Sequence, residues 1–298
     1  MGRGGELKLA IFDDVRAGIV DTAASRIVDV SDIVGADYRE TLGAGWWVRL
    51  CRDLPALRPR LDAALENAPS RALDSVRLRA AALNPSKIVA CASNYAAHVD
   101  EMMAVQQRVA GGMEAWMAEF DVFLKAPSSI IGPGEEIIMP PEPVAQGLET
   151  HHECELTVVI GRGGASIPAD EAFDHILGYT IALDITVRGK GDRSRRKSYD
   201  TFTPVGPWVV TADEIGDAHA LDISLAVNGE TRQNVNTSGL TVRIPEIIAY
   251  ASSCMRLEPG DLILTGAPPG VGQLHGGEQL VASISGIGAM PLTVRRPG

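Results

Sequence analysis

Two glutamates stand one residue apart at the start of an apolar run. Residues 151–160 read HHECELTVVI, so Glu153 and Glu155 lead directly into residues typical of a buried strand. Alternate side chains of a strand share a face, and these two carboxylates would lie about 7 Å apart along it. Two buried, unpartnered carboxylates repel each other, and a cation between them removes that conflict. The alternative is a partly exposed edge strand with solvated glutamates.

A third carboxylate lies inside another apolar run. Residues 178–187 read GYTIALDITV, with Asp184 as the charged residue, and Arg188 follows. A lone aspartate in such a segment needs a partner. Asp184 could complete a three-carboxylate site whose oxygen ligands suit Mg²⁺ or Mn²⁺, with waters in the remaining positions. An ion pair between Asp184 and Arg188, or a cap at the strand end, is the alternative.

A histidine and a glutamate are spaced to meet on a helix. Residues 93–106, SNYAAHVDEMMAVQ, predict a helix in which His98 and Glu101 are neighbours on one face. A carboxylate beside an imidazole orients it and supports its protonated form, as in general bases that activate water. A plain surface contact is the alternative.

Two further segments could contact a substrate. Residues 188–197, RGKGDRSRRK, carry six cations among ten residues and form either a solvated loop or a set of contacts to a carboxylate substrate. Residues 113–120, MEAWMAEF, place Met113, Trp116, Met117 and Phe120 at helical spacing after two glycines. This pattern predicts either a core-facing helix or a lid that closes over substrate.

Strands must position most of these residues. Turns rich in glycine and proline separate the candidate strands, which are KIVACA, TVVIG, GYTIALDITV, PWVVT, LDISLAVNG, DLILTG and VASISG. Helices are expected at 55–66, 72–82, 95–107, 113–121 and 244–256. Strands dominate without regular βα alternation, which indicates a β-rich α+β or β-roll fold. Near residue 80 the pattern changes to a region that begins with a strand, KIVACA, which predicts a small β-rich N-terminal domain, 1–80, and a main domain, 81–298.

Composition narrows the class of protein. The 298 residues carry a formal net charge of −11, which disfavours a broad nucleic-acid surface, although local cations could still bind a small anion. The four cysteines form no CxxC pair, which disfavours a disulfide framework or zinc site and favours a reduced, cytoplasmic setting. The sequence shows no signal-peptide core and no apolar stretch that approaches a membrane span, so we expect neither export nor membrane contact.

With these motifs assembled, the chain resembles the fumarylacetoacetate hydrolase family over roughly residues 85–294. The matching stretches are ASNYAAHVDEM, FLKAPSSIIGPGEEI, HHECELTVVIG, GYTIALDITVR, KSYDTFTPVGPWVVT, VNGETRQNVNTSG, LEPGDLILTGAPPGVG and SGIGAM. Many motifs in one order make the resemblance specific for the family, though not for one reaction. The HHExEL form of the glutamate strand is similar to acylpyruvate hydrolases, and 2-hydroxyhepta-2,4-diene-1,7-dioate isomerases are related members.

The resemblance implies a mixed β-roll catalytic domain, a homodimer, one Mg²⁺ or Mn²⁺ per chain and a place in aromatic catabolism. It implies that Glu153, Glu155 and Asp184 are the metal ligands. His98 and Glu101 match the pair that activates water in members that cleave acylpyruvates, and Lys197 matches the lysine of the KS[FY] motif. The candidate substrate-binding residues, each within a matching motif, are Tyr95, Arg188 and Thr237.

The chain departs from the family pattern at three positions. Gly189 and Gly191 stand where the family often has aspartate and glutamine, and Ala267 replaces a threonine that commonly contacts substrate. Polar contacts to substrate are therefore fewer, or they come from elsewhere, such as the basic residues of 188–197.

The resulting hypothesis is hydrolytic carbon–carbon cleavage of a 2,4-dioxo acid, such as an acylpyruvate or a fumarylpyruvate-like acid, to a pyruvate-type acid and a carboxylic acid. The partner would be a small anionic oxo acid. The alternative enzyme is a metal-dependent decarboxylase or isomerase of a related oxo-diacid, which needs no attacking water. A non-catalytic, metal-stabilised binding protein is the alternative from another class.

Overall fold

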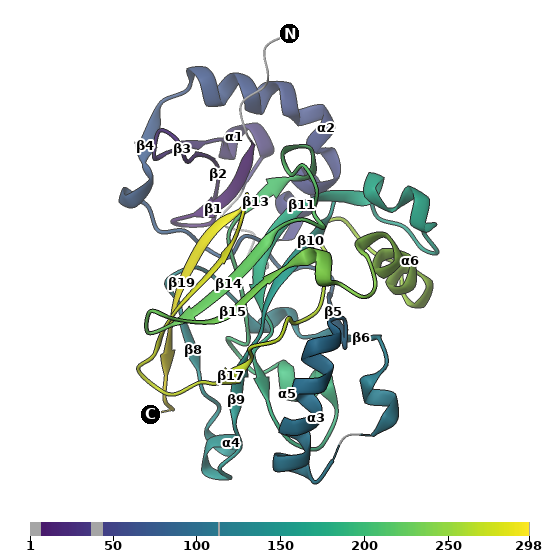
Figure 1. Ribbon diagram of the computed structural model, residues 1–298. Helices are drawn as coiled ribbons and strands as arrows, with labels where there is room; N and C mark the ends of the chain where they lie inside the picture. Colours follow the sequence, from purple (N-terminus) through teal and green to yellow (C-terminus); the bar gives the residue numbers. More distant parts are fainter. Residues whose placement is uncertain (1–6, 37–43, 113, 298) are drawn as a thin grey trace.

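One large mixed sheet runs through the protein. The computed structural model describes residues 7–36, 44–112 and 114–297 (Figure 1). The sheet has 11 strands, of which β7 (Ile130–Ile131) pairs with β13 beside the main path. The main path runs β4 (Ser70–Ala72), β3 (Arg26–Asp29), β2 (Arg16–Asp21), β1 (Lys8–Phe12), β13 (Thr203–Thr211), β11 (Ile176–Leu183), β10 (Cys154–Ile160), β16 (Leu262–Leu264), β5 (Ile88–Ala92) and β6 (Asp121–Lys125).

Two smaller sheets complete the strand structure. The five-stranded sheet has the order β15 (Glu230–Asn236), β14 (Asp222–Val227), β18 (Gln279–Ile284), β19 (Gly288–Arg295) and β8 (Glu136–Ile138). The three-stranded sheet has the order β12 (Thr186–Val187), β9 (Thr150–His152) and β17 (Gly272–Gln273). The predicted β-rich α+β architecture is confirmed.

The helices lie around these sheets. The α-helices are α1 (Ser31–Val34), α2 (Ala44–Asn67), α3 (Ala96–Ala110), α4 (Pro141–Ala145), α5 (Arg193–Lys197) and α6 (Ile244–Cys254). Short 3₁₀ turns are η1 (Leu73–Ser75), η2 (Ala115–Ala118), η3 (Pro127–Ser129), η4 (Ala169–His175), η5 (Ala212–Glu214) and η6 (Thr237–Gly239). Within the described ranges, no helix is both long enough and apolar enough to span a membrane.

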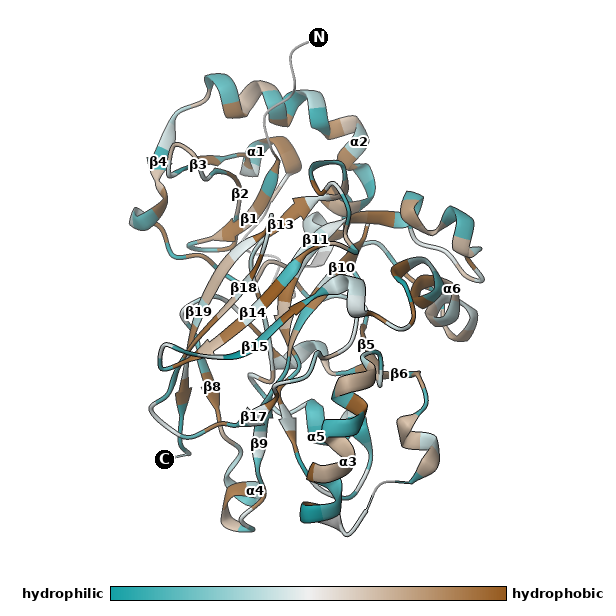
Figure 2. Ribbon diagram, in the orientation of Figure 1, coloured by the Kyte–Doolittle hydropathy of each residue, from teal (hydrophilic) through white to brown (hydrophobic). Residues whose placement is uncertain are grey.

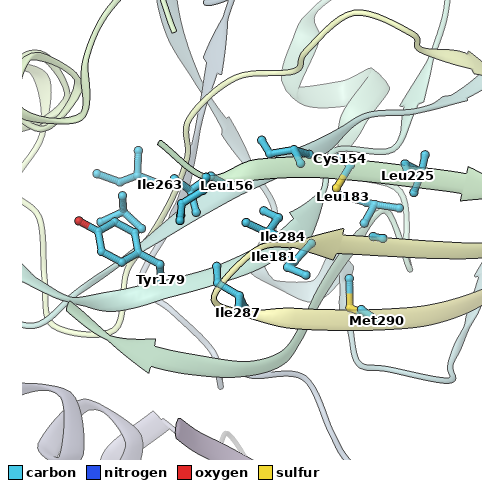
Figure 3. Packing of buried hydrophobic residues seen from close by; sticks show 14 of the residues in the cluster. Cys154, Leu156, Tyr179, Ile181, Leu183, Leu225, Ile263, Ile284, Ile287 and Met290 are labelled. Atoms are coloured by element: carbon cyan, nitrogen blue, oxygen red, sulfur yellow. The ribbon is translucent and has the colours of Figure 1, made fainter. Parts of the chain in front are cut away.

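The two faces of the large sheet bury different cores. One face packs against the five-stranded sheet, and Figure 3 shows side chains of β10 and β11 meeting side chains of the smaller sheet, among them Cys154, Leu183, Leu225 and Met290. The other face carries α2, whose Trp46, Trp47, Leu50 and Leu61 are buried with Leu9, Val209 and Leu262. Figure 2 shows these strands as largely hydrophobic and the outer helices as mixed. Strands buried on both faces explain the nearly continuous apolar runs of the sequence.

Most predicted elements are present, and two helices are not. The predicted helices at 55–66, 95–107 and 244–256 correspond to α2, α3 and α6, and α2 is much longer than expected. The predicted helix at 72–82 is wrong, because this segment is extended along β1, where Arg79 donates its backbone N–H to Ile11. Strand pairing overrides helix propensity at this point.

The predicted helix at 113–121 is also wrong. Met113 lies outside the described residues, and only the single 3₁₀ turn η2 forms before β6 begins at Asp121. Trp116 is exposed, whereas a core-facing helix would bury it. The apolar side chains of this segment line cavities instead of a helix-packed core: Met117 lines two of them and Trp116 lines one.

The N-terminal strands continue the large sheet. β1 pairs with β13 in antiparallel register, with Lys8 opposite Val210 and Leu9 opposite Val209. The segment up to residue 80 thus adds β1–β4 to one edge and places α2 on one face. The boundary near residue 80 stays a prediction about domain organisation.

Close packing at the centre of the sheet gives a test of the fold. A Cβ added at Gly178 in β11 would lie 2.1 Å from the carbonyl oxygen of Val210, and backbone cannot move aside easily. Gly178→Ala should therefore destabilise the protein by about 1–3 kcal/mol, measured by urea unfolding. Gly216→Ala is the matched control, since a Cβ there meets nothing within 4 Å, and it should change stability by less than about 0.5 kcal/mol. Equal midpoints for the two variants would contradict the register of β11 and β13.

Candidate metal centre and catalytic site

The candidate metal ligands lie where two neighbouring strands are interrupted at the same level. Glu153 separates β9 from β10, and Asp184 follows directly after β11. The backbone N–H of Asp184 donates to the carbonyl of Glu153 at 2.8 Å, so the two interruptions face each other. Each of these two residues therefore lies between two strands: Glu153 between β9 and β10, and Asp184 between β11 and β12.

Strand register places the three carboxylates on one face. Cys154 pairs with Leu183 and Glu155 with Ala182, so Glu153 lies opposite Asp184 and Glu155 shares their side. Ligand oxygens of Glu153, Glu155 and Asp184 all lie within 4.8 Å of one another, and all three residues are buried. Cys154 points to the opposite face, into the apolar core (Figure 3). The edge-strand alternative, with solvated glutamates, does not fit this burial.

Three cations surround two of these carboxylates. Lys197 Nζ lies 2.7 Å from Glu153 and 2.5 Å from Asp184, and Arg188 donates to the other oxygen of Glu153 at 2.5 Å. Lys125 Nζ donates to Asp184 at 2.6 Å and is itself fully buried. Burial lowers the pKa of Lys125, and the neighbouring Asp184 carboxylate opposes that shift. Asp184 thus pairs with two lysines rather than with Arg188.

Sequence reasoning missed Lys125. The residue lies in the matching stretch FLKAPSSIIGPGEEI, and it is a single charge at the end of a short apolar segment. The rule that singled out Asp184, a lone charge in an apolar run, applies equally to this lysine. Its amino group also donates to the carbonyls of Lys197 and Phe202, which fixes the chain that carries Lys197.

The donor set fits a hard divalent cation. Burial by itself would raise the pKa of Glu153, but Lys197 and Arg188 hold that pKa well below its usual value. For Glu155, burial followed by repulsion from Asp184 and Glu153 raises the pKa well above its usual value. Glu155 Oε1 is buried without a hydrogen-bond partner, while its other oxygen accepts the N–H of Gly266. An unsatisfied carboxylate oxygen beside two others suits Mg²⁺ or Mn²⁺.

One turn connects the carboxylates to α3. The segment 265–270 follows β16, and its Gly266 N–H donates to Glu155 at 2.6 Å while its Gly270 N–H donates to Glu101 at 3.1 Å. Asn94, just before α3, donates its side-chain amide to the carbonyl of Thr265 at 2.7 Å. The turn therefore fixes one carboxylate of the metal centre and the glutamate of the helix together.

The predicted histidine–glutamate pair forms. His98 and Glu101 are one helical turn apart on α3, with 3.5 Å between Nδ1 of the histidine and Oε2 of the glutamate. This distance is longer than a hydrogen bond, and Nδ1 has no other partner. Such contacts are often long before substrate binds. His98 is buried and lines the same cavity as Glu153, whereas Glu101 is partly exposed, and the role of the pair stays a prediction.

One small cavity is lined by both His98 and Glu153. Its volume is about 70 Å³, below the range of about 300–1,000 Å³ of typical ligand pockets. Gln106, Met117, Phe123 and Arg193 line both this cavity and a larger hollow of about 990 Å³, so the two adjoin. The lid expected over residues 113–120 stays a prediction. The cavity is lined by Cys91, Ala92, Ser93, His98, Val99, Met102, Gln106, Met117, Phe123, Glu153, Arg188, Arg193, Arg196, Lys197 and Ala267.

The predicted substrate-binding residues differ in position. Arg188 lines the cavity. Tyr95 is buried near it without lining it, and its hydroxyl has no hydrogen-bond partner. Thr237 lies away from the cavity, and its hydroxyl accepts the backbone N–H of Leu221 at 2.9 Å. The roles of Tyr95 and Thr237 stay predictions.

His151 and His152 are buried neighbours of the metal centre. Burial lowers the pKa of each to about 4, which keeps both neutral near pH 7. Nε2 of His151 lies 2.8 Å from Glu149, and Nδ1 of His152 lies 3.4 Å from Gln233. They support the backbone that leads into Glu153 and do not belong to the carboxylate cluster.

Comparison with known proteins agrees with this geometry. The family model described as fumarylacetoacetate (FAA) hydrolase, C-terminal, matches residues 87–295. A maleylpyruvate hydrolase of Aquipseudomonas alcaligenes is 36% identical over 292 residues, which cover 97% of this chain and 99% of that protein.

Solved structures extend the likeness to nearly the whole chain. The maleylpyruvate hydrolase of Sphingobium sp. SYK-6, in complex with manganese(II) and pyruvate, matches with a TM-score of 0.84 at 36% identity, covering 98% of this chain and 100% of that one. A 2-hydroxyhepta-2,4-diene-1,7-dioate isomerase of Mycobacterium marinum matches with a TM-score of 0.71 at 28% identity, covering 98% and 99%. This chain belongs to the fumarylacetoacetate hydrolase family.

Proposed function

We propose that this enzyme hydrolyses a carbon–carbon bond of a 2,4-dioxo acid to give a pyruvate-type acid and a carboxylic acid. The observation that carries the proposal is that His98, paired with Glu101, lines the same cavity as Glu153, one of the three clustered carboxylates. The relatives named maleylpyruvate hydrolase, one of them in complex with manganese(II) and pyruvate, support the same reaction.

The three carboxylates would hold one divalent ion. Glu153, Glu155 and Asp184 are the proposed ligands, and Glu155 has an oxygen that no group of the described protein satisfies. Such an ion supplies Lewis-acid polarisation of the oxygen atoms of a chelating oxo acid. The manganese(II) in the related structure supports Mn²⁺, and Mg²⁺ is the second candidate because all three ligands are hard oxygens.

The side chains divide the reaction between them. His98 takes a proton from a water whose oxygen attacks the distal carbonyl carbon, and Glu101 orients the imidazole and offsets its positive charge. Lys197 is placed to stabilise negative charge on the oxygen of that carbonyl. When the bond between C3 and C4 breaks, its electron pair leaves on C3. The proton that His98 took from the water then passes to C3, which completes the pyruvate-type product, and the added water oxygen remains on the carboxylic acid.

A decarboxylase or isomerase of a related oxo-diacid is the second candidate. The Mycobacterium marinum relative is named an isomerase, and such chemistry needs the carboxylate cluster but no attacking water. An isomerase could also use the buried His98 to transfer a proton, so hydrolysis is favoured instead by the relative named maleylpyruvate hydrolase, which is 36% identical to this chain, against 28% for this isomerase.

Several properties of the working enzyme are also proposed. All four cysteines are free, which supports a reducing, cytoplasmic setting. A homodimer is proposed from membership of the family. The small anionic oxo-acid partner is supported by the cations that line the cavity and by the pyruvate in the related structure.

Substitution of the histidine separates the two candidate reactions. His98→Ala should lower kcat for hydrolysis of a 2,4-dioxo acid by about 10²–10⁴-fold, because water loses its general base. The measurement is the loss of the enolic absorbance of the substrate with Mn²⁺ present. Decarboxylation of an oxo-diacid such as oxaloacetate by the same variant should change little if the wild type catalyses it. Intact hydrolysis by His98→Ala would refute the assignment of the base.

Removal of one carboxylate charge tests the metal centre. Glu155→Gln should weaken Mn²⁺ binding on the order of 100-fold, measured by calorimetric titration, because the ligand charge falls and a buried amide replaces a carboxylate. Glu142→Gln on the surface of α4 is the control and should bind Mn²⁺ like the wild type. EDTA should abolish hydrolysis by the wild type, and activity indifferent to EDTA would rule out the metal site.

A further inference from the structure

We propose that Gln233 is a positioning residue, whose amide holds the strand of Glu153 and Glu155 and the 265–270 turn at a fixed separation. Gln233 lies on β15 of the five-stranded sheet, and it neither lines the cavity nor belongs to the carboxylate cluster. The inference rests on the proposed function and deepens it, because it explains how another sheet places the proposed metal ligands and Glu101.

The side chain of Gln233 is fully buried, and both of its polar atoms are bonded to backbone. Its Oε1 accepts the N–H of Cys154 at 3.0 Å, and its Nε2 donates to the carbonyl of Pro268 at 3.0 Å. Nδ1 of His152 lies 3.4 Å from the same Oε1. The two backbone partners fix the orientation of the amide, since a flipped amide would set donor against donor and acceptor against acceptor. One side chain thus connects β10 of the large sheet to the turn.

The first bond is made at the peptide group between Glu153 and Cys154, where the chain passes from β9 to β10. The carbonyl of this group accepts the N–H of Asp184 at 2.8 Å, and its N–H donates to Gln233. A buried N–H at an interruption of the strands needs an acceptor, and the glutamine supplies it. Because this peptide group lies between Glu153 and Glu155 in the chain, its orientation sets the direction of both side chains.

The second bond holds the turn whose N–H groups donate to Glu155 and Glu101. Gln233 bonds this turn at Pro268, which lies in the chain between the two glycines that make those donations. A shift of the turn at Pro268 would therefore move a donor to the carboxylate cluster and a donor to the proposed water-activating pair. The glutamine thus acts on both through backbone groups.

Close packing supports the turn beside this bond. A Cβ added at Gly270 would lie 2.1 Å from the carbonyl oxygen of Arg232, the residue before Gln233 on β15. Gly270 also has φ +91°, a conformation that residues with a Cβ rarely adopt. The backbone of the turn therefore lies directly against the backbone of β15, at the position where the amide bond is made.

An apolar side chain could fill the same buried position on β15. Methionine is similar to glutamine in volume and shape, and it needs no hydrogen-bond partner in a core. With methionine there, the N–H of Cys154 and the carbonyl of Pro268 would be buried without their present partner. The glutamine is therefore explained by its two bonds and not by the packing of the strand.

Replacement of the amide by a side chain of similar volume tests the inference. Gln233→Met should weaken Mn²⁺ binding by about 10-fold in calorimetric titration, because a strand that can shift holds its ligands less accurately. The kcat for hydrolysis should fall by at least about 10-fold, since Glu101 loses the support of the turn as well. Asn234→Met, at the exposed neighbouring position of β15, is the matched control and should retain both values.

Two further variants separate the placement of the ligands from the stability of the fold. Gln233→Glu keeps an acceptor and, in the neutral form that burial favours, an O–H donor, so it should bind Mn²⁺ more tightly than Gln233→Met. Gly178→Ala weakens the large sheet at a different place and should bind Mn²⁺ like the wild type. Equal losses of Mn²⁺ affinity in Gly178→Ala and Gln233→Met would mean a general effect of stability and overturn the inference, as would wild-type affinity in Gln233→Met.

Hydrogen exchange keeps the test independent of metal binding and of the reaction. In the metal-free protein, the segments 150–156 and 264–274 should exchange faster in Gln233→Met than in the wild type, measured by mass spectrometry, and Asn234→Met should not differ. Gln233→Asn, one methylene too short to reach both partners, should behave like Gln233→Met and replaces it if that variant does not fold. Faster exchange without hydrolysis of any 2,4-dioxo acid supports the inference, and only the proposed function then fails. Unchanged exchange in both segments would overturn the inference even for an active hydrolase.

Discussion

Burial of three carboxylates within 4.8 Å of one another is the constraint on which the site depends. Negative charges so close and so far from water disfavour the folded state unless opposite charge is placed among them. Lys125, Lys197 and Arg188 supply that charge for Glu153 and Asp184, each from a different segment. Among the described residues Glu155 has no ion-pair partner, and its unpaired oxygen is where the proposed divalent ion would contribute most. The cations thus hold Glu153 and Asp184 in place, and the proposed divalent ion would complete the neutralisation.

The turn at 265–270 ties the carboxylate cluster to the proposed water-activating pair. Its backbone donates to Glu155 and to Glu101, and Asn94 ties its first residue to the start of α3. A shift of α3 relative to the sheet would therefore disturb two carboxylates with different tasks. The turn holds only Glu101 of this pair directly, and His98 lies 3.5 Å from that glutamate.

Two kinds of site residue could be predicted from the sequence. The first has its partner one turn away on the same helix, and the second is a charged residue within an apolar strand, where burial without a partner is costly. His98 and Glu101 follow from helical spacing, and Glu153, Glu155 and Asp184 follow from charges placed in apolar strands. The sequence did not predict Lys125, because its partner is 59 residues away and only the sheet brings them together. The false helices at 72–82 and 113–121 have the same origin, since pairing with distant strands and the covering of a cavity outweigh local periodicity. The roles of the individual site residues stay predictions.

One face of the large sheet is apolar at one end of β10 and acidic at the other. Near α2 it is apolar, with Val159 and Leu177 buried against the N-terminal helix, and at the other end of β10 it carries Glu153 and Glu155. The change occurs within six residues of one strand, so the same hydrogen-bonded ladder that is stabilised by the apolar core holds the ligands. Rigid elements position reactive groups more accurately than loops do. The basic helix α5 is the complementary element, because its Lys197 adds positive charge beside Glu153 and Asp184, next to that of Lys125 on β6.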